Sequence, residues 1–457
     1  MQNQIYYYMG LKRYYFTNIL KLLFLQASFI LLINATHAQN YRNPYSYYGI
    51  GELQEKTFIA NNCLSGLSIG WYDLSSYSPM NPASYSNMFT STFDIGMKGK
   101  IQHLEQNNNS YTSNIISFSY FSLGFPIKKK IKWAAAFGLL PVSSIGYKNS
   151  NTTSYNDIDT FDKIETFENS GGFSQAYLGT SVQLFKKLNI GANLSYLFGN
   201  TNDLHKQEFT GNTKYINILE SNLRSYGNLY SEFGVQYIHT IKGNEKEKVK
   251  GNEKDRFLTI GAVFSPGTKL PAYSKRIVQT FLNYSGTYYY RDSIINTETK
   301  SGELFIPAKT GIGLTYSLPG KYKLGLDYRF EQWSAFKDFY GSNQNLKNMH
   351  IVALGSELTP ERNSISYFKR ITYRAGAKYT SSYLNFGDGA LKVISGSLGF
   401  GFPITNKFNK QIINQINIGM NAGKYLNVPK DGIKESFINL YFGVRFNDFW
   451  FIQPKID

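Results

Sequence analysis

The stretch from residue 437 to residue 446, Phe-Ile-Asn-Leu-Tyr-Phe-Gly-Val-Arg-Phe, constrains the fold of this chain more than any other. Side chains alternate across a β-strand with a period of two. One face of such a strand would carry only apolar residues: Ile438, Leu440, Phe442, Val444 and Phe446. The other face would carry Asn439, Gly443 and Arg445 together with Phe437 and Tyr441. Two-faced strands of this kind recur through most of the chain and predict a transmembrane β-barrel whose apolar face meets lipid.

The first 38 residues have the pattern of an export signal. A basic start precedes an apolar run over residues 19–33, and the small residue Ala38 ends a typical cleavage motif. A permanent helical anchor is the alternative, but the run is short and a cleavage site follows it. We therefore expect a signal peptide over residues 1–38, cleavage near Ala38/Gln39, and export to the bacterial outer membrane.

Composition is compatible with a barrel or with a soluble secreted protein. No later segment has about 18 consecutive apolar residues, which a transmembrane helix would need. Aromatic residues make up 16% of the chain, as in the aromatic girdles of membrane barrels, although a carbohydrate-binding β-protein could be equally rich in tyrosine. Cys63 is the one cysteine, so an intrachain disulfide is excluded.

The net charge of +17 is spread along the chain rather than gathered in a dense basic block. Nucleic-acid binding is therefore not expected, and outer-membrane lipid is the expected partner.

Residues 39–88 do not alternate and are rich in glycine, proline, serine and asparagine. Their aromatic content argues against disorder, so we predict a compact N-terminal plug, or hatch, inside the barrel lumen. The residues proposed for it are Asn43, Pro44, Gly49, Gly51, Gly66, Gly70, Asn81, Pro82, Ala83 and Ser84. For residues 81–84 an ordinary turn into the first strand is the alternative to a hatch element.

Residues 89–457 are predicted to form the transmembrane barrel. A β-sandwich also alternates, but several runs here reach about nine to twelve residues, the length that crosses a bilayer at a tilt. About 14 or 15 such segments can be counted, and single-chain bacterial barrels usually have an even number of strands, so we predict 14. Polar loops are expected between them, at about 148–171, 199–225, 242–256, 291–303, 338–347 and 359–369.

Charged residues recur on the polar faces of the later strands. On the lipid face an arginine or lysine costs about 2–4 kcal/mol at the midplane, so these residues should face the lumen. A salt-bridged network that fills the barrel is one interpretation, and contacts to the plug or to a passing solute are the other. The set is Lys323, Asp327, Arg329, Glu331, Arg374, Lys378 and Arg445.

No catalytic, metal or cofactor site is expected. The histidines are far apart and lack metal-binding spacing. Residues 66–70 match G-x-S-x-G, but no helical pattern follows, so the glycines are better explained by tight turns. Gly396, Gly399 and Gly401 lie within one strand, where glycine marks a bend or a close approach of backbone.

Several short stretches, taken in order, resemble the FadL/TodX-type outer-membrane transport proteins. They are residues 43–53, residues 65–70, Asn81-Pro82-Ala83-Ser84, residues 306–313, residues 373–376 and the ending at 446–451, which is similar to a poorly characterised branch of that family. The resemblance implies a 14-stranded barrel, a small N-terminal hatch, and passive uptake of hydrophobic small molecules of the long-chain fatty acid or aromatic hydrocarbon class. The ligand-binding residues of that family have no identified counterparts in this sequence.

Three functions remain as hypotheses. An uptake channel requires an apolar pocket between hatch and wall. A non-transporting barrel that anchors or shuttles surface or secreted proteins requires a closed lumen and a broad exposed external patch. A barrel enzyme requires a carboxylate or Ser/His cluster at the outer rim, and the sequence contains no such cluster, so we expect a protein that is not an enzyme.

Overall fold

The structure is a computed structural model that describes residues 43–155, 161–211, 215–242, 255–284, 287–299, 302–386, 389–405 and 413–449. The predicted signal peptide, its cleavage site and the last residues of the chain lie outside these ranges. Among the described residues, helices are short, and none has the length and apolar character to cross a membrane.

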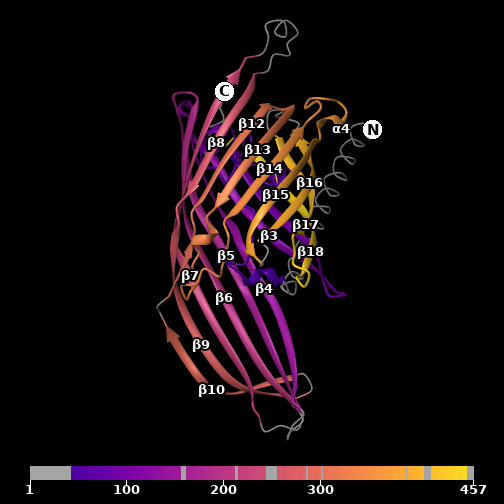
Figure 1. Ribbon diagram of the computed structural model, residues 1–457. Coiled ribbons are helices and arrows are strands. Elements are labelled where there is room, and N and C mark those ends of the chain that lie inside the picture. The colour runs from indigo at the N-terminus through magenta and orange to yellow at the C-terminus, as the bar shows by residue number, and fades with distance from the viewer. Residues whose placement is uncertain are drawn as a thin grey trace, which may run out of the picture. The chain divides into compact units, whose positions relative to one another are not determined.

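Fourteen strands form a closed antiparallel barrel, which confirms the predicted fold class (Figure 1). Closure comes from the pairing of the last strand with the first, in which Gly443 lies opposite Gly96. The strands are β2 (Ser91–Gln106), β3 (Asn109–Lys128), β4 (Trp133–Tyr155), β5 (Phe161–Leu184), β6 (Leu188–Gly211), β7 (Asn217–Ile241), β8 (Arg256–Ser265), β12 (Lys309–Leu318), β13 (Tyr322–Glu331), β14 (Met349–Leu358), β15 (Thr372–Asn385), β16 (Ala390–Thr405), β17 (Ile413–Leu426) and β18 (Lys434–Asp448).

The two faces of the barrel strands follow the sequence alternation. In β13, Leu324 and Leu326 are exposed on the outside, while Lys323 and Asp327 are buried on the inside. The same arrangement holds in β18, where the apolar set predicted for lipid is largely exposed and Arg445 is buried. An apolar outer wall with polar residues inside is the arrangement of a membrane barrel.

Three further strands lie outside the ring: β9 (Thr268–Tyr284), β10 (Thr287–Thr299) and β11 (Glu303–Ile306). β9 pairs with the first half of β7, and β10 pairs with β9. β9 and β10 form an open sheet with the long ends of β4 to β7, in the order β4–β5–β6–β7–β9–β10. This sheet extends beyond the barrel at the lower end of Figure 1. We call this the projecting sheet.

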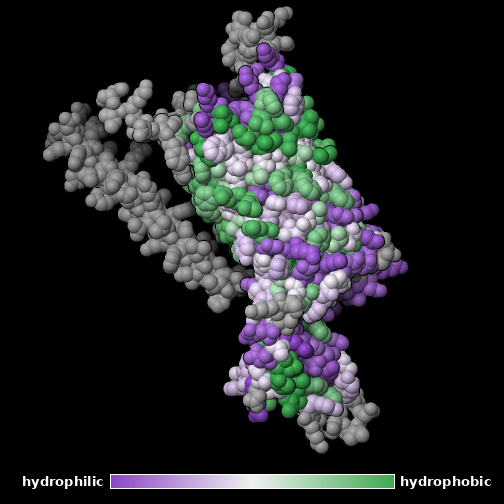
Figure 2. Space-filling model, turned by 90° about the vertical axis from the view of Figure 1, so that its left-hand side faces the viewer, coloured by the Kyte–Doolittle hydropathy of each residue, from purple (hydrophilic) through white to green (hydrophobic). Residues whose placement is uncertain are grey.

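The projecting sheet corrects part of the loop prediction. Most of residues 148–171 and 199–225, and residues 291–299, are strands rather than loops. Alternation did not reveal them because both faces of these strand ends carry polar residues. Figure 2 shows hydrophobic surface over the barrel wall and a mostly hydrophilic zone toward the lower end, where a smaller hydrophobic cluster stands apart.

The projecting sheet lies at one end of the barrel, and the Ser91 end of β2 and the Asp448 end of β18 lie at the other. Ser91 pairs with Asp448, and these are the first and last residues of the barrel. The short turns β3–β4 and β5–β6 lie at the same end. In bacterial barrels the shorter turns face the periplasm and the longer connections face outward. The end with Ser91 and Asp448 also carries a longer connection, residues 359–371 between β14 and β15, so short and long connections occur at both ends of the barrel.

Residues 43–90, which we call the inner segment, contain four short elements: η2 (Pro44–Tyr47), β1 (Glu52–Leu53), α2 (Ile59–Asn62) and η3 (Pro82–Asn87). The segment hydrogen-bonds to widely separated parts of the ring. The Ile59 amide donates to Tyr120 Oη of β3 at 2.9 Å, and Ser65 Oγ lies 2.8 Å from Ser397 Oγ of β16. A segment that reaches both walls in this way lies within the barrel.

Candidate functional site: the barrel interior

Every barrel strand carries a glycine in one band around the inside of the wall. Glycines on neighbouring strands often lie directly opposite each other, as in Gly191/Gly234, Gly261/Gly313 and Gly399/Gly419. We call this set the glycine band: Gly96, Gly124, Gly138, Gly179, Gly191, Gly234, Gly261, Gly313, Gly325, Gly355, Gly376, Gly399, Gly419 and Gly443. Gly399 lies at a close approach of the Cys63 side chain, 2.4 Å from where a Cβ would stand, whereas a Cβ on Gly396 would meet only one atom, at 3.8 Å.

The glycine band is where the inner segment meets the wall. A Cβ built on any member except Gly138 would fall within 3.0 Å of an atom of the inner segment. At Gly191 it would lie 2.5 Å from the carbonyl carbon of Pro82, and at Gly376 it would lie 2.5 Å from that of Leu64. Real Cβ atoms do not approach other atoms so closely, so glycine is required for this contact.

The first four predicted plug residues shape the start of the inner segment. The Asn43 side chain accepts from the Tyr45 amide at 3.0 Å, and Pro44 occupies the first turn of η2. Gly49 and Gly51 both have positive φ, which few residues other than glycine adopt readily. A Cβ on Gly51 would also lie 2.5 Å from the Ile145 side chain of β4.

The remaining predicted plug residues lie against the glycine band. Gly66 has positive φ, and a Cβ on Gly70 would lie 3.0 Å from Gly313 of β12. Asn81 begins η3 by accepting from the Ala83 amide at 3.1 Å, and it donates to the Ile69 carbonyl at 2.7 Å.

Asn81 therefore caps the short helix Pro82–Asn87, and Ser84 Oγ donates to the Asn81 carbonyl at 2.8 Å. Whether residues 81–84 act as a hatch remains a prediction.

Glu55 of the inner segment joins two of the predicted lumen charges. Arg329 of β13 donates to one of its carboxylate oxygens at 2.9 Å, and Lys378 of β15 donates to the other at 2.7 Å. Burial raises the pKa of Glu55, but the two cations outweigh burial and hold that pKa well below its usual range. The carboxylate stays ionised and ties the inner segment to two wall strands.

Two further lumen charges, both on β13, bind the inner segment. Lys323 forms an ion pair with Asp73, and its ammonium lies 4.0 Å from the centre of the Trp71 ring. Asp327 accepts from the Ser68 amide at 2.6 Å and from the Ile69 amide at 2.8 Å. The G-x-S-x-G stretch is thus held by a wall carboxylate through its backbone.

The other three lumen charges pair mainly with the wall. Glu331 accepts from the Trp333 indole at 2.9 Å, Arg374 donates to Glu357 at 2.8 Å, and Arg445 donates to Asp94 at 2.7 Å. The predicted set therefore divides between contacts to the inner segment and contacts within the wall.

Sequence reasoning missed the acidic partners of these cations. Glu55 and Asp73 lie in a stretch without alternation, which gave no indication of where their side chains point. Asp94 could have been found, because it is an isolated acid between Phe93 and Ile95 and so falls on the polar face of an alternating run.

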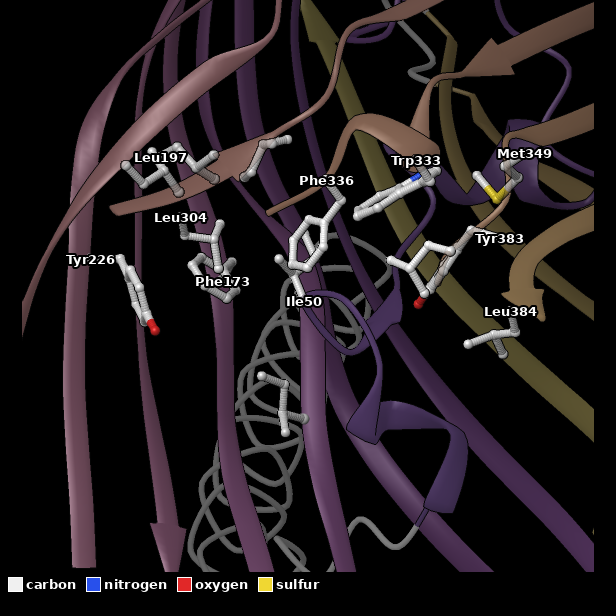
Figure 3. Close-up of a cluster of buried hydrophobic side chains, with 14 of the residues drawn as sticks. Ile50, Phe173, Leu197, Tyr226, Leu304, Trp333, Phe336, Met349, Tyr383 and Leu384 are labelled. Carbon is white, nitrogen blue, oxygen red and sulfur yellow. The ribbon is translucent and has the colours of Figure 1, made fainter. Parts of the chain in front are cut away.

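At the end of the barrel near the projecting sheet, a cluster of apolar side chains fills the lumen. Its centre is the connection between β13 and β14, where Trp333 and Phe336 are fully buried. In Figure 3 these two rings lie beside each other, with Ile50 of the inner segment below Phe336. Leu304 of β11 and Tyr383 of β15 complete the contact, and we call the group the outer cluster.

A cavity of about 290 Å³ remains between the outer cluster and the inner segment. Part of its wall is apolar, including Leu140, Leu197 and Ile306. The rest carries ten charged side chains: Glu52, Glu55, Lys56, Lys98, Lys100, Glu232, Lys309, Arg329, Glu331 and Lys378. Most of these charged groups pair with one another, as Lys56 does with Glu232 and Lys309 with Glu331, so the lining combines apolar surface with neutralised charges.

The described residues contain no group of His, Cys, Asp or Glu side chains that could hold a metal ion. Cys63 is buried beside Gly399 and Gly419 and has no second thiol.

The chain matches the family model BamG over residues 19–457. The chain belongs to the BamG family. A search of curated protein sequences finds no match to this member of the family.

Solved structures with a similar fold include the Pseudomonas putida toluene transporter TodX, with a TM-score of 0.55, 13% identity, and coverage of 86% of this chain and 99% of that one. A Pseudomonas aeruginosa FadL homologue has a TM-score of 0.54 and 11% identity, with coverage of 87% and 99%. The CymD monoaromatic hydrocarbon channel has a TM-score of 0.52 and 12% identity, with coverage of 87% and 98%. At these identities the likeness establishes the FadL-like fold alone.

Proposed function

We propose that this chain is an outer-membrane barrel that does not conduct solutes at rest and serves as a partner in the assembly of outer-membrane or surface proteins. The observation that carries the proposal is the filled interior. The inner segment meets the wall at nearly every strand through the glycine band, and Glu55, Asp73 and the Ser68–Ile69 backbone are each held by wall charges. The family name, BamG, supports a link to the Bam complex.

The exterior supports the same proposal. An apolar outer wall suits insertion in outer-membrane lipid, and a sheet that extends beyond the barrel offers a surface to a partner protein. The alternative to transport, a barrel that anchors or shuttles surface or secreted proteins, requires a closed lumen and a broad exposed external patch.

Two measurements test this proposal. Purified chain in planar bilayers should give no conductance steps, while a variant lacking residues 43–88 should conduct. Affinity purification of the tagged chain from solubilised outer membranes should recover the central barrel subunit of the Bam complex, and depletion of the chain should lower the amounts of other outer-membrane barrels. Normal barrel amounts after depletion, with no recovery of that subunit, would refute the assembly role.

Passive uptake of hydrophobic small molecules, of the long-chain fatty acid or aromatic hydrocarbon class, is the second candidate. The apolar side of the interior cavity favours it, and the names of two solved proteins with this fold, a monoaromatic hydrocarbon channel and a toluene transporter, support the aromatic hydrocarbon class. Uptake of both solute classes should be measured in cells with and without the chain, and loss of uptake on deletion, restored by the intact chain, would establish transport instead.

A further inference from the structure

The projecting sheet has two open edges, and they differ. From Tyr147 onward, β4 pairs only with β5 among the described residues, and β10 pairs only with β9. No further strand within the described ranges pairs with either edge. Natural proteins protect such edges with lysine, proline, bulges or coverage, because an open edge binds other extended chains.

The β4 edge has the composition of a protected edge. Residues 148–155 are Lys-Asn-Ser-Asn-Thr-Thr-Ser-Tyr, all exposed, small or polar until the last residue. Such an edge offers little apolar area to a partner strand.

The β10 edge offers far more apolar area. It begins with three consecutive tyrosines, Tyr288, Tyr289 and Tyr290, which are 42%, 55% and 57% exposed, and it continues to Ile294, which is 61% exposed. Residues 287–299 contain neither lysine nor proline. Tyrosine provides large contact area with little loss of side-chain entropy and is enriched in protein interfaces.

We propose that the β10 edge binds an extended segment of a partner polypeptide at the cell surface as an added strand. Only an extended backbone matches the spacing of the groups on an open edge, and flanking side chains then give specificity. The pairing of β10 with β9 is regular at residues 287–290 and 295–299, with register shifts between them. The partner strand would therefore pair over two short stretches.

The chemistry of the partner segment follows from the side chains of β10. Opposite the tyrosines we expect β-branched or aromatic residues, which pair well across strands. Arg291 is exposed between the two regular stretches and favours an acidic residue on the partner. A second copy of this chain fits less well, because two edges with register shifts would have to align with each other.

This inference rests on the proposed function only for placing the edge at the cell surface. It is tested by hydrogen exchange of the intact chain, once in native outer-membrane vesicles and once purified in detergent. Amides of residues 287–299 should exchange at least tenfold more slowly in vesicles, while those of residues 148–155 should exchange equally in both. Equal exchange at both edges would overturn the inference whatever the Bam purification shows.

Matched variants identify the side chains involved. Tyr290→Lys combined with Ile294→Lys adds the charges that protect natural edges, and Thr152→Lys combined with Ser154→Lys does the same on β4. Only the first pair should abolish the slow exchange in vesicles, and both should leave the barrel resistant to unfolding in SDS without heating. Slow exchange that appears in detergent and rises with the concentration of the chain itself would show self-association and overturn the inference.

If β10 is protected in vesicles but the Bam subunit is not recovered, the strand addition stands and the proposed assembly partner is wrong.

Discussion

The barrel interior and the projecting sheet use the same kinds of residue to opposite effect. Inside, ion pairs are shielded from water, as that of Arg445 with Asp94 is, in which the two side chains are 7% and 1% exposed. In the projecting sheet, Glu165 pairs with Lys163 and His205 on a face that water reaches. The comparison teaches that burial decides whether an ion pair fixes a structure, because water screens the exposed pairs and offers their charges an alternative.

The largest expected effect concerns the outer cluster. Trp333→Ala removes a fully buried ring and should lower the free energy of unfolding by about 3–5 kcal/mol, or open the β13–β14 connection locally. Urea titration and limited proteolysis of the connection would measure the two outcomes. Tyr340→Ala in the same connection is the control, since Tyr340 is 75% exposed. An equal decrease in the free energy of unfolding in both variants would contradict the role of the outer cluster.

Overpacking of the glycine band should come next. Gly376→Val places a side chain against the backbone of Leu64 and should cost about 1–3 kcal/mol, because the wall or the inner segment must shift. Gly396→Val is matched to it, since a Cβ there meets only one atom, at 3.8 Å. The urea midpoint and the conductance of both variants should be compared, and an unchanged Gly376→Val barrel would mean that the inner segment is loosely held.

Removal of the Glu55 carboxylate should cost about 2 kcal/mol, because Arg329 and Lys378 lose a charged acceptor. Glu55→Gln keeps the shape of the side chain and removes its charge. Thermal unfolding of the purified barrel measures this loss of stability. A loss no greater than the one caused by breaking an exposed ion pair would show that the interior is well hydrated.

The same residue predicts a pH dependence. Because the pKa of Glu55 is lowered in the folded chain, its stabilising effect is complete above the usual value of 4.5 and is lost as the pH falls toward the lowered value. The wild-type chain should therefore lose stability below about pH 4.5, and Glu55→Gln should lose less. Parallel acid titrations of the two proteins, with unfolding followed by tryptophan fluorescence, would reveal the difference or its absence.

The smallest effect is expected in the projecting sheet. Glu165→Gln removes the partner of Lys163 and His205 on a face that water reaches, where these side chains are 24–31% exposed, and the urea midpoint should not change measurably. A shift as large as that of Glu55→Gln would mean that the projecting sheet is covered in the protein as purified.

The barrel strands could be predicted because lipid and lumen impose opposite requirements on alternate residues. The sequences of β13 and β18 alternate between apolar and polar residues accordingly. The projecting strands were taken for loops because water reaches both faces, so that no alternation marks residues 161–171 or 201–211. The sequence also contains a glycine in each barrel strand, but their alignment depends on the register between strands, which no single strand specifies.

By itself the sequence determined the antiparallel barrel and the face that each barrel residue presents, because both follow from a local period of two. The strand number came from a count of the alternating segments together with the even number that bacterial barrels usually have. Only the tertiary structure decided which charges meet, where the inner segment lies against the glycine band, and that four barrel strands continue past the barrel and join β9 and β10 in one sheet. Those features join residues hundreds of positions apart, such as Cys63 and Gly399, and contacts of that kind arise only when the ring has closed.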